Sequence, residues 1–464
     1  MDFMESERDS SWWSRPCGVR EVLTLALPLV ISTMSWTIMS FIDRTFLMWY
    51  STDAMAAAMP ASAVSFSFIC LAMGVASYVG TFVAQYNGAQ QFERIGPIVW
   101  QGVWIGVGCI PVFFALRSLS PYLFDQVGHP ATITQLETAY FKTLCWGAAA
   151  VVISSALSGF FSGREETVVI MVVSAVAALL NIALDYAWIF GKAGFPEGGI
   201  VGAATATNVS EWAKAVIYLV LMIRRDRQGT FGVLRRVGID RVLMRRLIWF
   251  GGPNGLQMFV ETAAFSAYLL LVGRLGENEL AATTLAFNVN QIAFVPMLGL
   301  GFAASILVGN QIGRQRLDLA ERATWTTLSI AILYAGLMAA LYWTLPDTFL
   351  ILHKIGADVH EFEAVRDITV VLLRFVAVYC IWDAVLIVFS SAIKGAGDTR
   401  FVLLAAMALS PIPVISGWIG IEYWNWTLMH FWFLVTAWII TQAFVYFARF
   451  MQGRWRTMSV IETT

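Results

Sequence analysis

Charged residues are scarce in this chain of 464 residues. Lys, Arg, Asp and Glu together make up 13% of it, whereas 58% of its residues are hydrophobic. Most of the charges lie between long apolar runs, with few inside them. Soluble globular proteins carry about twice this share of charge. The composition therefore argues against a soluble protein and predicts a polytopic membrane protein.

Cysteine and histidine are also rare, at five and four residues. Four of the cysteines lie within apolar runs, so we expect them to pack and not to form disulfides. The chain lacks a Gly-x-x-x-x-Gly-Lys-Ser/Thr phosphate loop, a His-Glu-x-x-His zinc pair and a Gly-x-Ser-x-Gly elbow. We therefore expect neither an enzyme nor a bound cofactor, and any uphill transport must use an ion gradient. The formal net charge of −1 argues against a nucleic-acid partner.

Twelve predominantly apolar runs follow one another along the chain, and each is long enough to cross about 30 Å of hydrocarbon as a helix. The first six fall at about 23–49, 55–84, 95–116, 140–161, 168–189 and 200–223, and the last six at about 248–272, 280–309, 323–345, 368–393, 401–421 and 428–450. We predict an all-α membrane protein with twelve transmembrane helices.

The chain is an internal duplication. Asp53-Ala-Met-Ala-Ala recurs 225 residues later as Asn278-Glu-Leu-Ala-Ala, and the same offset pairs Pro28 with Pro253. Two repeated halves with a site at their interface are typical of secondary transporters. The predicted parts are an N-terminal tail (1–22), an N-lobe (23–225), a basic linker (226–247), a C-lobe (248–450) and a C-terminal tail (451–464), with six transmembrane helices in each lobe.

Lys and Arg distribute unevenly between the two sides of the membrane. With the N-terminus inside, the inner segments hold 21 of these residues and the outer loops hold five. The positive-inside rule therefore predicts that both tails and the linker lie in the cytoplasm.

Five acidic residues lie inside apolar runs. One of them, Glu211, has Lys214 three residues later, and we expect these two to form an ion pair on the helix surface. The other four stand out: Asp43, Asp185, Glu261 and Asp383. A carboxylate in hydrocarbon costs several kcal/mol and is rarely kept there without a use. At about 1.5 Å per helical residue, the first two lie roughly 25–30 Å from the cytoplasmic end and the last two roughly 15–20 Å from it. The acids therefore form two pairs of similar depth, one in each half. An interfacial ion pair without a transport role stays open for Asp43, which precedes Arg44, and an interfacial position stays open for Asp185.

Neutral polar side chains accompany these acids. Asn181, Gln257 and Tyr379 each precede an acid by four residues and so share its helix face. Asn288 adds an amide in the eighth run, before Pro296. Such oxygen-rich sets suit Na⁺ or a proton better than a transition metal. We take Glu261 and Asp383 as candidate Na⁺ ligands in the C-lobe, with Tyr379, Gln257 and Asn288 beside them.

Several motifs resemble those of one family. They are Gly252-Pro253-Asn-Gly255-Leu-Gln257 with Glu261, Asn181-Ile-Ala-Leu-Asp185-Tyr186, and Lys394-Gly395-Ala-Gly397-Asp398-Thr399. Over about residues 23–450 the chain resembles multidrug and toxin extrusion (MATE) transporters.

This resemblance implies two pseudo-symmetric six-helix bundles around a cavity that opens alternately to each side. It implies a transporter of the bacterial inner membrane that exports cationic amphipathic drugs or toxic metabolites in exchange for Na⁺ or H⁺. We expect such a protein to act as a monomer in contact with membrane lipids.

The resemblance also assigns residues. Glu261, Tyr379 and Asp383 match the C-lobe cation site of the NorM-type branch. The N-lobe site of other branches is matched by Asp43, Asn181, Asp185 and Thr207. The chain departs from the NorM pattern at Asp185, where that branch more often has Asn, and at Arg44. The coupling ion and the dominant lobe are therefore left open.

A lipid-linked oligosaccharide flippase of the same superfamily is the main alternative. Its anionic cargo would favour basic residues in the cavity, whereas acids prevail here in mid-membrane. A channel or a receptor fits less well, because neither needs duplicated ion-binding acids. A membrane-embedded enzyme fits less well because the sequence shows no catalytic group for it. For the exporter, we expect Na⁺ to bind in the C-lobe and protons in the N-lobe.

Overall fold

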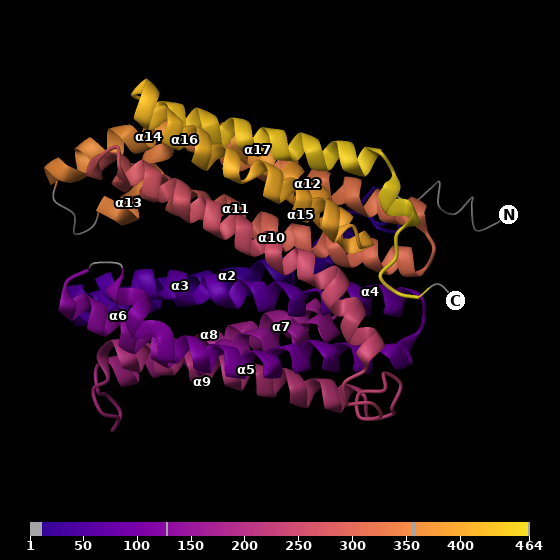
Figure 1. Cartoon of the computed structure of the whole chain (residues 1–464). Coiled ribbons are helices and arrows are strands. Elements are labelled where there is room, and N and C mark those ends of the chain that lie inside the picture. Colours follow the sequence, from indigo (N-terminus) through magenta and orange to yellow (C-terminus); the bar gives the residue numbers. More distant parts are fainter. Residues whose placement is uncertain (1–11, 127–128, 355–358, 463–464) are drawn as a thin grey trace. The chain divides into compact units, whose positions relative to one another are not determined.

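The computed structural model describes residues 12–126, 129–354 and 359–462, and within these ranges it contains helices and no strand (Figure 1). Eleven helical segments of the described chain are long and apolar enough to cross a membrane. A twelfth is obtained when the bent pair Ala131–Leu144 and Ala148–Ser162 is counted as one span. The prediction of an all-α polytopic membrane protein is confirmed.

Contacts divide the chain into two compact units. Among the described residues, unit 1 contains those up to Val30 together with those of Val260–Ser459, and unit 2 contains those of Ile31–Phe259 and those from Val460. The divisions at Val30 and Phe259 fall inside helices α2 (Val19–Tyr50) and α10 (Arg241–Gly273). The predicted lobes, 23–225 and 248–450, follow the repeat along the chain and stay a prediction.

Unit 2 is built around helix α3 and small residues. Besides parts of α2 and α10, its helices are α3 (Thr52–Ser77), α4 (Val79–Gly88), η1 (Phe92–Arg94), α5 (Ile95–Asp125), α6 (Ala131–Leu144), α7 (Ala148–Ser162), α8 (Thr167–Ile189) and α9 (Gly199–Arg225). Ala54, Ala57 and Ala61 of α3 lie in one core with Phe113 and Phe141. Small residues let helices approach closely where lipid supplies no hydrophobic driving force.

Unit 1 is organised around α14, which contacts α11, α12 and α17. Its helices, besides parts of α2 and α10, are α11 (Glu277–Gly313), α12 (Leu317–Thr344), α13 (Pro346–Lys354), α14 (Val359–Ala396), α15 (Thr399–Leu409), α16 (Pro411–Trp424), α17 (Leu428–Met451) and η2 (Arg454–Thr457). The predicted eleventh run is thus covered by α15 and α16, and Pro411 begins the second of these helices.

The duplication is visible in two glycine contacts. Gly74 of α3 lies against Gly255 of α10, and a Cβ on either glycine would overlap the backbone of the other helix. Gly299 of α11, the repeat partner of Gly74, lies against α2, where a Cβ would stand 2.8 Å from the backbone nitrogen of Val30. Each half therefore receives the beginning of a helix from the other half, which explains why both unit divisions fall inside helices.

The fourth predicted span, 140–161, is not one continuous helix. It is bent by 41° between α6 and α7. Asn208 of α9 donates from Nδ2 to the carbonyl of Thr143 at 2.6 Å, and the indole of Trp212 donates to the carbonyl of Trp146 at 3.1 Å. A backbone carbonyl at membrane depth needs a partner inside the protein. Side chains of α9 supply these partners at the bend.

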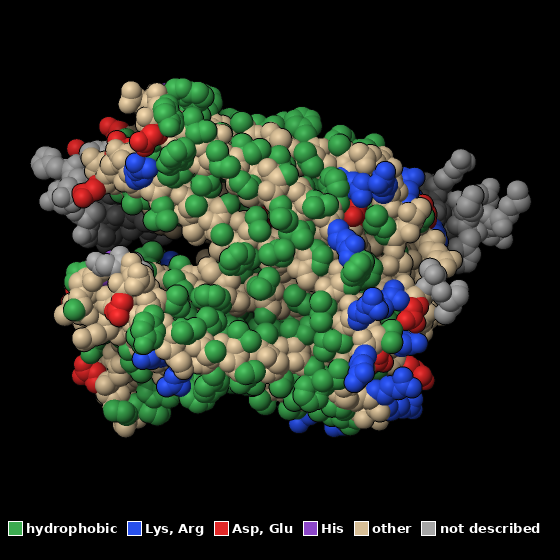
Figure 2. All heavy atoms as spheres, in the orientation of Figure 1, with side chains coloured by type: hydrophobic (Ala, Val, Ile, Leu, Met, Phe, Trp, Pro, Cys, Tyr) green, Lys and Arg blue, Asp and Glu red, His purple; other side chains and the backbone are tan. Residues whose placement is uncertain are grey.

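The surface reflects the composition. On the face shown in Figure 2, hydrophobic side chains cover the middle, while Lys and Arg gather mostly toward one end of the helices. This pattern is typical of a protein with an apolar belt in lipid and a basic rim at one interface.

Candidate functional site

The N-lobe site gathers on three helices of unit 2. Asn181 and Asp185 lie one turn apart on α8 and are fully buried. With its amide oriented so that both ends are satisfied, Asn181 donates from Nδ2 to Asp185 Oδ2 at 2.9 Å. Its Oδ1 accepts from the backbone N–H of Thr207 on α9 at 3.3 Å. The amide therefore fixes the Asp185 carboxylate against α9.

Asp43 of α2 completes the N-lobe site. It interacts electrostatically with Asp185, and Tyr140 of α6 interacts with both acids. The Oδ1 atoms of Asp43 and Asp185 are buried and have no hydrogen-bond partner among the described residues. Arg44, the neighbour of Asp43, is exposed and also interacts electrostatically with it. Two carboxylates that interact in a low dielectric favour the uptake of a positive charge, which a proton or a monovalent cation would supply.

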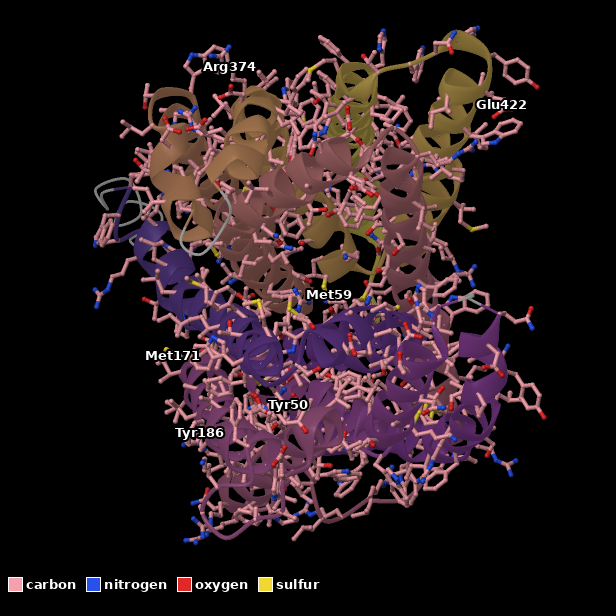
Figure 3. The ribbon with its side chains drawn as sticks, turned by 90° about the vertical axis from the view of Figure 1, so that its left-hand side faces the viewer. Tyr50, Met59, Met171, Tyr186, Arg374 and Glu422 are labelled. Atoms are coloured by element: carbon pink, nitrogen blue, oxygen red, sulfur yellow. The ribbon has the colours of Figure 1, made fainter. Side chains whose placement is uncertain are left out.

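Aromatic rings adjoin these acids. The ring of Phe46, one turn after Asp43, lies 6.0 Å from the rings of both Tyr186 and Phe190. Phe190 in turn lies 6.3 Å from Tyr50, and Figure 3 shows Tyr50 and Tyr186 in the same part of unit 2. Tyr186 is half exposed. Rings of this kind attract flat organic cations through their π faces.

The C-lobe site is centred on α14 of unit 1. Asp383 and Tyr379 lie one turn apart, and both are buried. The Tyr379 hydroxyl interacts electrostatically with Asp383, and it has no hydrogen-bond partner in the described part of the chain. The ring of Tyr379 stacks on Trp432 of α17 with 6.5 Å between centroids. The structure thus places the predicted tyrosine and acid together, with the ring of Trp432 stacked on the tyrosine.

Glu261 has partners that the sequence did not indicate. It lies on the part of α10 that belongs to unit 1, and it interacts electrostatically with Lys394 at the end of α14 and with Tyr446 of α17. Lys394 directly follows the apolar run 368–393, a position where a lysine ordinarily indicates a cytoplasmic boundary. A lysine of the chain itself therefore lies within electrostatic range of one candidate cation ligand.

The two predicted amides occupy different surroundings. Gln257 is buried on the part of α10 that belongs to unit 2, whereas Asn288 is exposed on α11 of unit 1. The described residues contain no group of three or more His, Cys, Asp or Glu side chains placed to hold a metal ion. A Na⁺ ion in the C-lobe would therefore need neutral oxygens as well as the acids.

Two other membrane acids are paired within the protein. Glu211 bonds to Lys214 three residues later on α9, at 3.0 Å, as expected from the spacing. Glu137 of α6 was not singled out, since it precedes the apolar run. It is fully buried, and His129 bonds to it through Nδ1 at 2.8 Å.

Comparison with known proteins gives consistent matches along most of the chain. The MatE family model matches residues 28–187 and 253–419, so the second match begins at the repeat partner of the residue that begins the first. The chain is 28% identical to the probable multidrug resistance protein NorM of Xylella fastidiosa over 395 residues, which are 84% of this chain and 82% of the relative. It is also 28% identical to the multidrug resistance protein NorM of Photobacterium profundum over 388 residues, 83% of each.

Two solved structures show the same fold. A MOP superfamily transporter from Pyrococcus furiosus superposes with a TM-score of 0.85 at 19% identity, covering 94% of this chain and 96% of that one. An outward-facing multidrug resistance MATE family transporter superposes with a TM-score of 0.83 at 19% identity, covering 96% of each.

Proposed function

The chain belongs to the MatE family of membrane transporters, and we propose that it exports cationic amphipathic drugs or toxic metabolites in exchange for protons, Na⁺ or both. The observation that carries this proposal is the pair Asp43 and Asp185, which interact electrostatically and whose buried Oδ1 atoms have no hydrogen-bond partner among the described residues. The names of its relatives, multidrug resistance proteins, agree with it.

The exchange follows from competition for negative charge. A proton or Na⁺ neutralises a buried carboxylate, and a cationic substrate nearby is attracted to the same carboxylate. Binding of one ligand therefore weakens binding of the other, and a ligand shifts the conformational equilibrium only through its different affinity for the two states. The aromatic rings beside Asp43 and Asp383 would hold the flat apolar part of the substrate.

Alternating access is the proposed transport cycle. The two halves are repeats, and α2 and α10 each belong partly to both contact units. Each of these helices carries a proline, Pro28 or Pro253, whose missing N–H weakens the helix locally. We propose that α2 and α10 bend near these prolines as the protein opens to one side or the other.

The proposed location is the bacterial inner membrane, with both termini in the cytoplasm. The uneven distribution of Lys and Arg supports this orientation.

A transport assay tests the proposal. Everted vesicles that contain the protein should accumulate a fluorescent cation such as ethidium when a pH or Na⁺ gradient is imposed. Under the pH gradient, Asp185→Asn should lose this accumulation, whereas Asp53→Asn, which removes an exposed acid at the start of α3, should keep it. Failure of the unmodified protein to move ethidium under either gradient would reject drug export and favour the flippase alternative.

A further inference from the structure

The linker between α9 and α10 is held firmly on the beginning of α5. The indole N–H of Trp100 donates to the carbonyl of Val233 at 2.7 Å, and the indole N–H of Trp104 donates to the carbonyl of Val237 at 2.7 Å. Each tryptophan thereby uses its only side-chain donor on the linker backbone. The linker is therefore an ordered segment with a defined surface.

A turn at the start of the linker is equally well defined. The two carboxylate oxygens of Asp226 accept the backbone N–H groups of Phe231 and Val233, each at 2.7 Å. Gly232 between them has a φ of 66°, and a Cβ there would stand 2.8 Å from the carbonyl oxygen of Glu93. Only glycine fits this left-handed turn without strain. The turn brings the following arginines over the beginning of α5.

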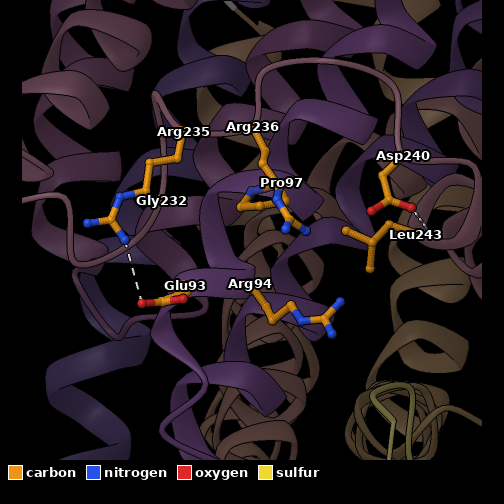
Figure 4. A pocket seen from close by; sticks show the side chains of 8 residues that line it. All are labelled: Glu93, Arg94, Pro97, Gly232, Arg235, Arg236, Asp240 and Leu243. Atoms are coloured by element: carbon orange, nitrogen blue, oxygen red, sulfur yellow. Dashed lines mark hydrogen bonds and ion pairs between the residues drawn. The ribbon is translucent and has the colours of Figure 1, made fainter.

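A cavity of about 430 Å³ lies between this linker and the first turns of α5. Its charged lining consists of Arg94, Arg235, Arg236, Glu93 and Asp240. Figure 4 shows the three arginines around one space, with Asp240 and Leu243 at its other side. The lining therefore has one more positive charge than negative charges.

The two acids of the lining already have partners. Asp240 Oδ1 accepts the backbone N–H groups of Val242 and Leu243 at 2.9 and 3.2 Å, so it caps the first turn of α10. Glu93 lies 3.6 Å from Arg235 in an exposed ion pair, which is worth little in water.

Two arginines retain unused capacity. Arg94 has a loose ion pair with Glu462, at 3.7 Å, which leaves most of its five donors available. Arg236 has no hydrogen bond or ion pair to any described residue, although it lines the cavity. A ligand with several negatively charged oxygens would satisfy both guanidinium groups, and phosphate is the group whose geometry suits arginine best.

Apolar side chains stand exposed on both sides of these arginines. Leu234 is 64% exposed, and Ile239 and Val242 are each 60% exposed. Exposed apolar residues that alternate with arginines are typical of a segment lying at a membrane interface. The preferred ligand therefore carries hydrocarbon as well as phosphate.

We propose that the cavity of Arg94, Arg235 and Arg236 binds the phosphate-bearing headgroup of an anionic membrane lipid. The bound lipid would fix the linker against α5 and place its acyl chains beside Leu234 and Ile239. This site is separate from the membrane acids, and the proposal does not depend on which cargo or ion the protein transports.

Arg236→Ala is the most direct test, because the side chain has no described partner whose loss would disturb the fold. The full-length protein in a neutral detergent is titrated with dihexanoyl phosphatidic acid, dihexanoyl phosphatidylcholine and inorganic phosphate, and binding is measured by calorimetry or native mass spectrometry. Arg227→Ala is the matched control, since it removes an exposed arginine from the same linker outside the cavity lining. Equal melting temperatures would show that both variants fold.

The proposal expects saturable binding of phosphatidic acid, about 10-fold weaker in Arg236→Ala and unchanged in Arg227→Ala, with little binding of phosphatidylcholine. An equal loss in both variants would show only diffuse attraction to basic residues and would overturn the site. Equal affinity for the zwitterionic lipid would also overturn it. Inorganic phosphate binding as tightly as phosphatidic acid would overturn the lipid assignment in favour of a soluble phosphate ligand.

Discussion

Asp185 is the residue in which burial, charge and orientation coincide most clearly. Asn181 bonds to one of its oxygens, and the other is buried and unsatisfied among the described residues. A neutral side chain of the same shape could keep the first bond but could not hold a coupling cation. A neutral substitution at this position therefore tests the role in transport while it preserves the structural hydrogen bond.

We expect Asp185→Asn and Asp43→Asn each to abolish efflux driven by a pH gradient, because either change leaves one carboxylate where two now compete for a proton. Protein level and melting temperature should stay close to those of the unmodified protein. The measurement is ethidium accumulation in everted vesicles, with Asp53→Asn as the control. Normal proton-driven accumulation in both site variants would refute the role of this pair.

In the C-lobe we expect Glu261→Gln and Asp383→Asn each to abolish efflux coupled to a Na⁺ gradient while expression is retained, because removing the charge removes the competition between ion and substrate. Glu277→Gln, which neutralises an exposed acid in the first turn of α11, serves as the control. Near-normal efflux in both site variants at matched protein levels would contradict the assignment.

The acids of the candidate sites could be predicted from the sequence more readily than the residues that interact with them. A carboxylate inside an apolar run is conspicuous, and the spacing of four residues pointed to Asn181 and Tyr379. Tyr140 and Lys394 could not be found in this way, because each comes from a helix remote in sequence from the acid that it approaches. Lys394 also follows an apolar run, where a lysine ordinarily indicates a cytoplasmic boundary.

At the level of elements, the bend between α6 and α7 is the clearest departure from a regular pattern. No proline occurs between Leu144 and Ala148 to signal it. The carbonyl partners of the bend are Asn208 and Trp212, which lie 65 and 66 residues away in the chain. Local sequence could therefore predict a span here but not its break.

Asn208→Ala tests this explanation. The variant should lose the bond to the Thr143 carbonyl and leave a polar group poorly satisfied, which typically costs about 1–3 kcal/mol. We expect a lower melting temperature in detergent. Thr205→Ala on the same helix should have little effect, since its exposed hydroxyl bonds only to a carbonyl of its own helix. Equal stability of both variants would show that Asn208 does not maintain the bend.

The glycine contacts give a second test at this level. Gly255→Ala places a methyl group against the backbone of Leu71, whereas Gly252→Ala, three residues earlier on α10, meets open space. We expect the first variant to be less stable by about 1–3 kcal/mol, the usual cost of overpacking, and the second to be neutral. Thermal unfolding in detergent measures both, and an equally stable Gly255→Ala would disprove the close approach of α3 and α10.

At the scale of the whole molecule, the internal duplication was the feature that the sequence predicted most reliably. The family model matches twice, and its two matches begin at the paired positions Pro28 and Pro253. The sequence could not predict that the beginnings of α2 and α10 belong to the unit formed mostly by the other half. A repeat defines which segments are equivalent but not which of them pack together. The repeat offset of 225 residues pairs Gly74 with Gly299, but only the structure shows which helix lies against each glycine.

The two halves have diverged in chemistry, and this leads to our prediction about the ion. The N-lobe has two acids that interact electrostatically, and the amide of Asn181 joins one of them to α9, which suits a proton. The C-lobe has Asp383 beside Tyr379 on α14, and thus a charged and a neutral oxygen of the kind that Na⁺ prefers, while Glu261 on α10 lies within electrostatic range of Lys394. We expect Na⁺ to bind in the C-lobe, protons to bind in the N-lobe, and efflux to respond to either gradient.

The two gradients can be separated in proteoliposomes. Ethidium transport should occur with an imposed Na⁺ gradient at equal pH on both sides, and this component should disappear in Asp383→Asn but persist in part in Asp185→Asn. With a pH gradient in Na⁺-free buffer, transport should disappear in Asp185→Asn and persist in part in Asp383→Asn. The reason is that each variant retains the ion site of the lobe that is not mutated. Replacing Na⁺ by choline controls for ionic strength. If a Na⁺ gradient drives no transport at fixed pH, and Na⁺ leaves substrate affinity unchanged, the C-lobe sodium site is wrong and coupling to protons alone explains transport.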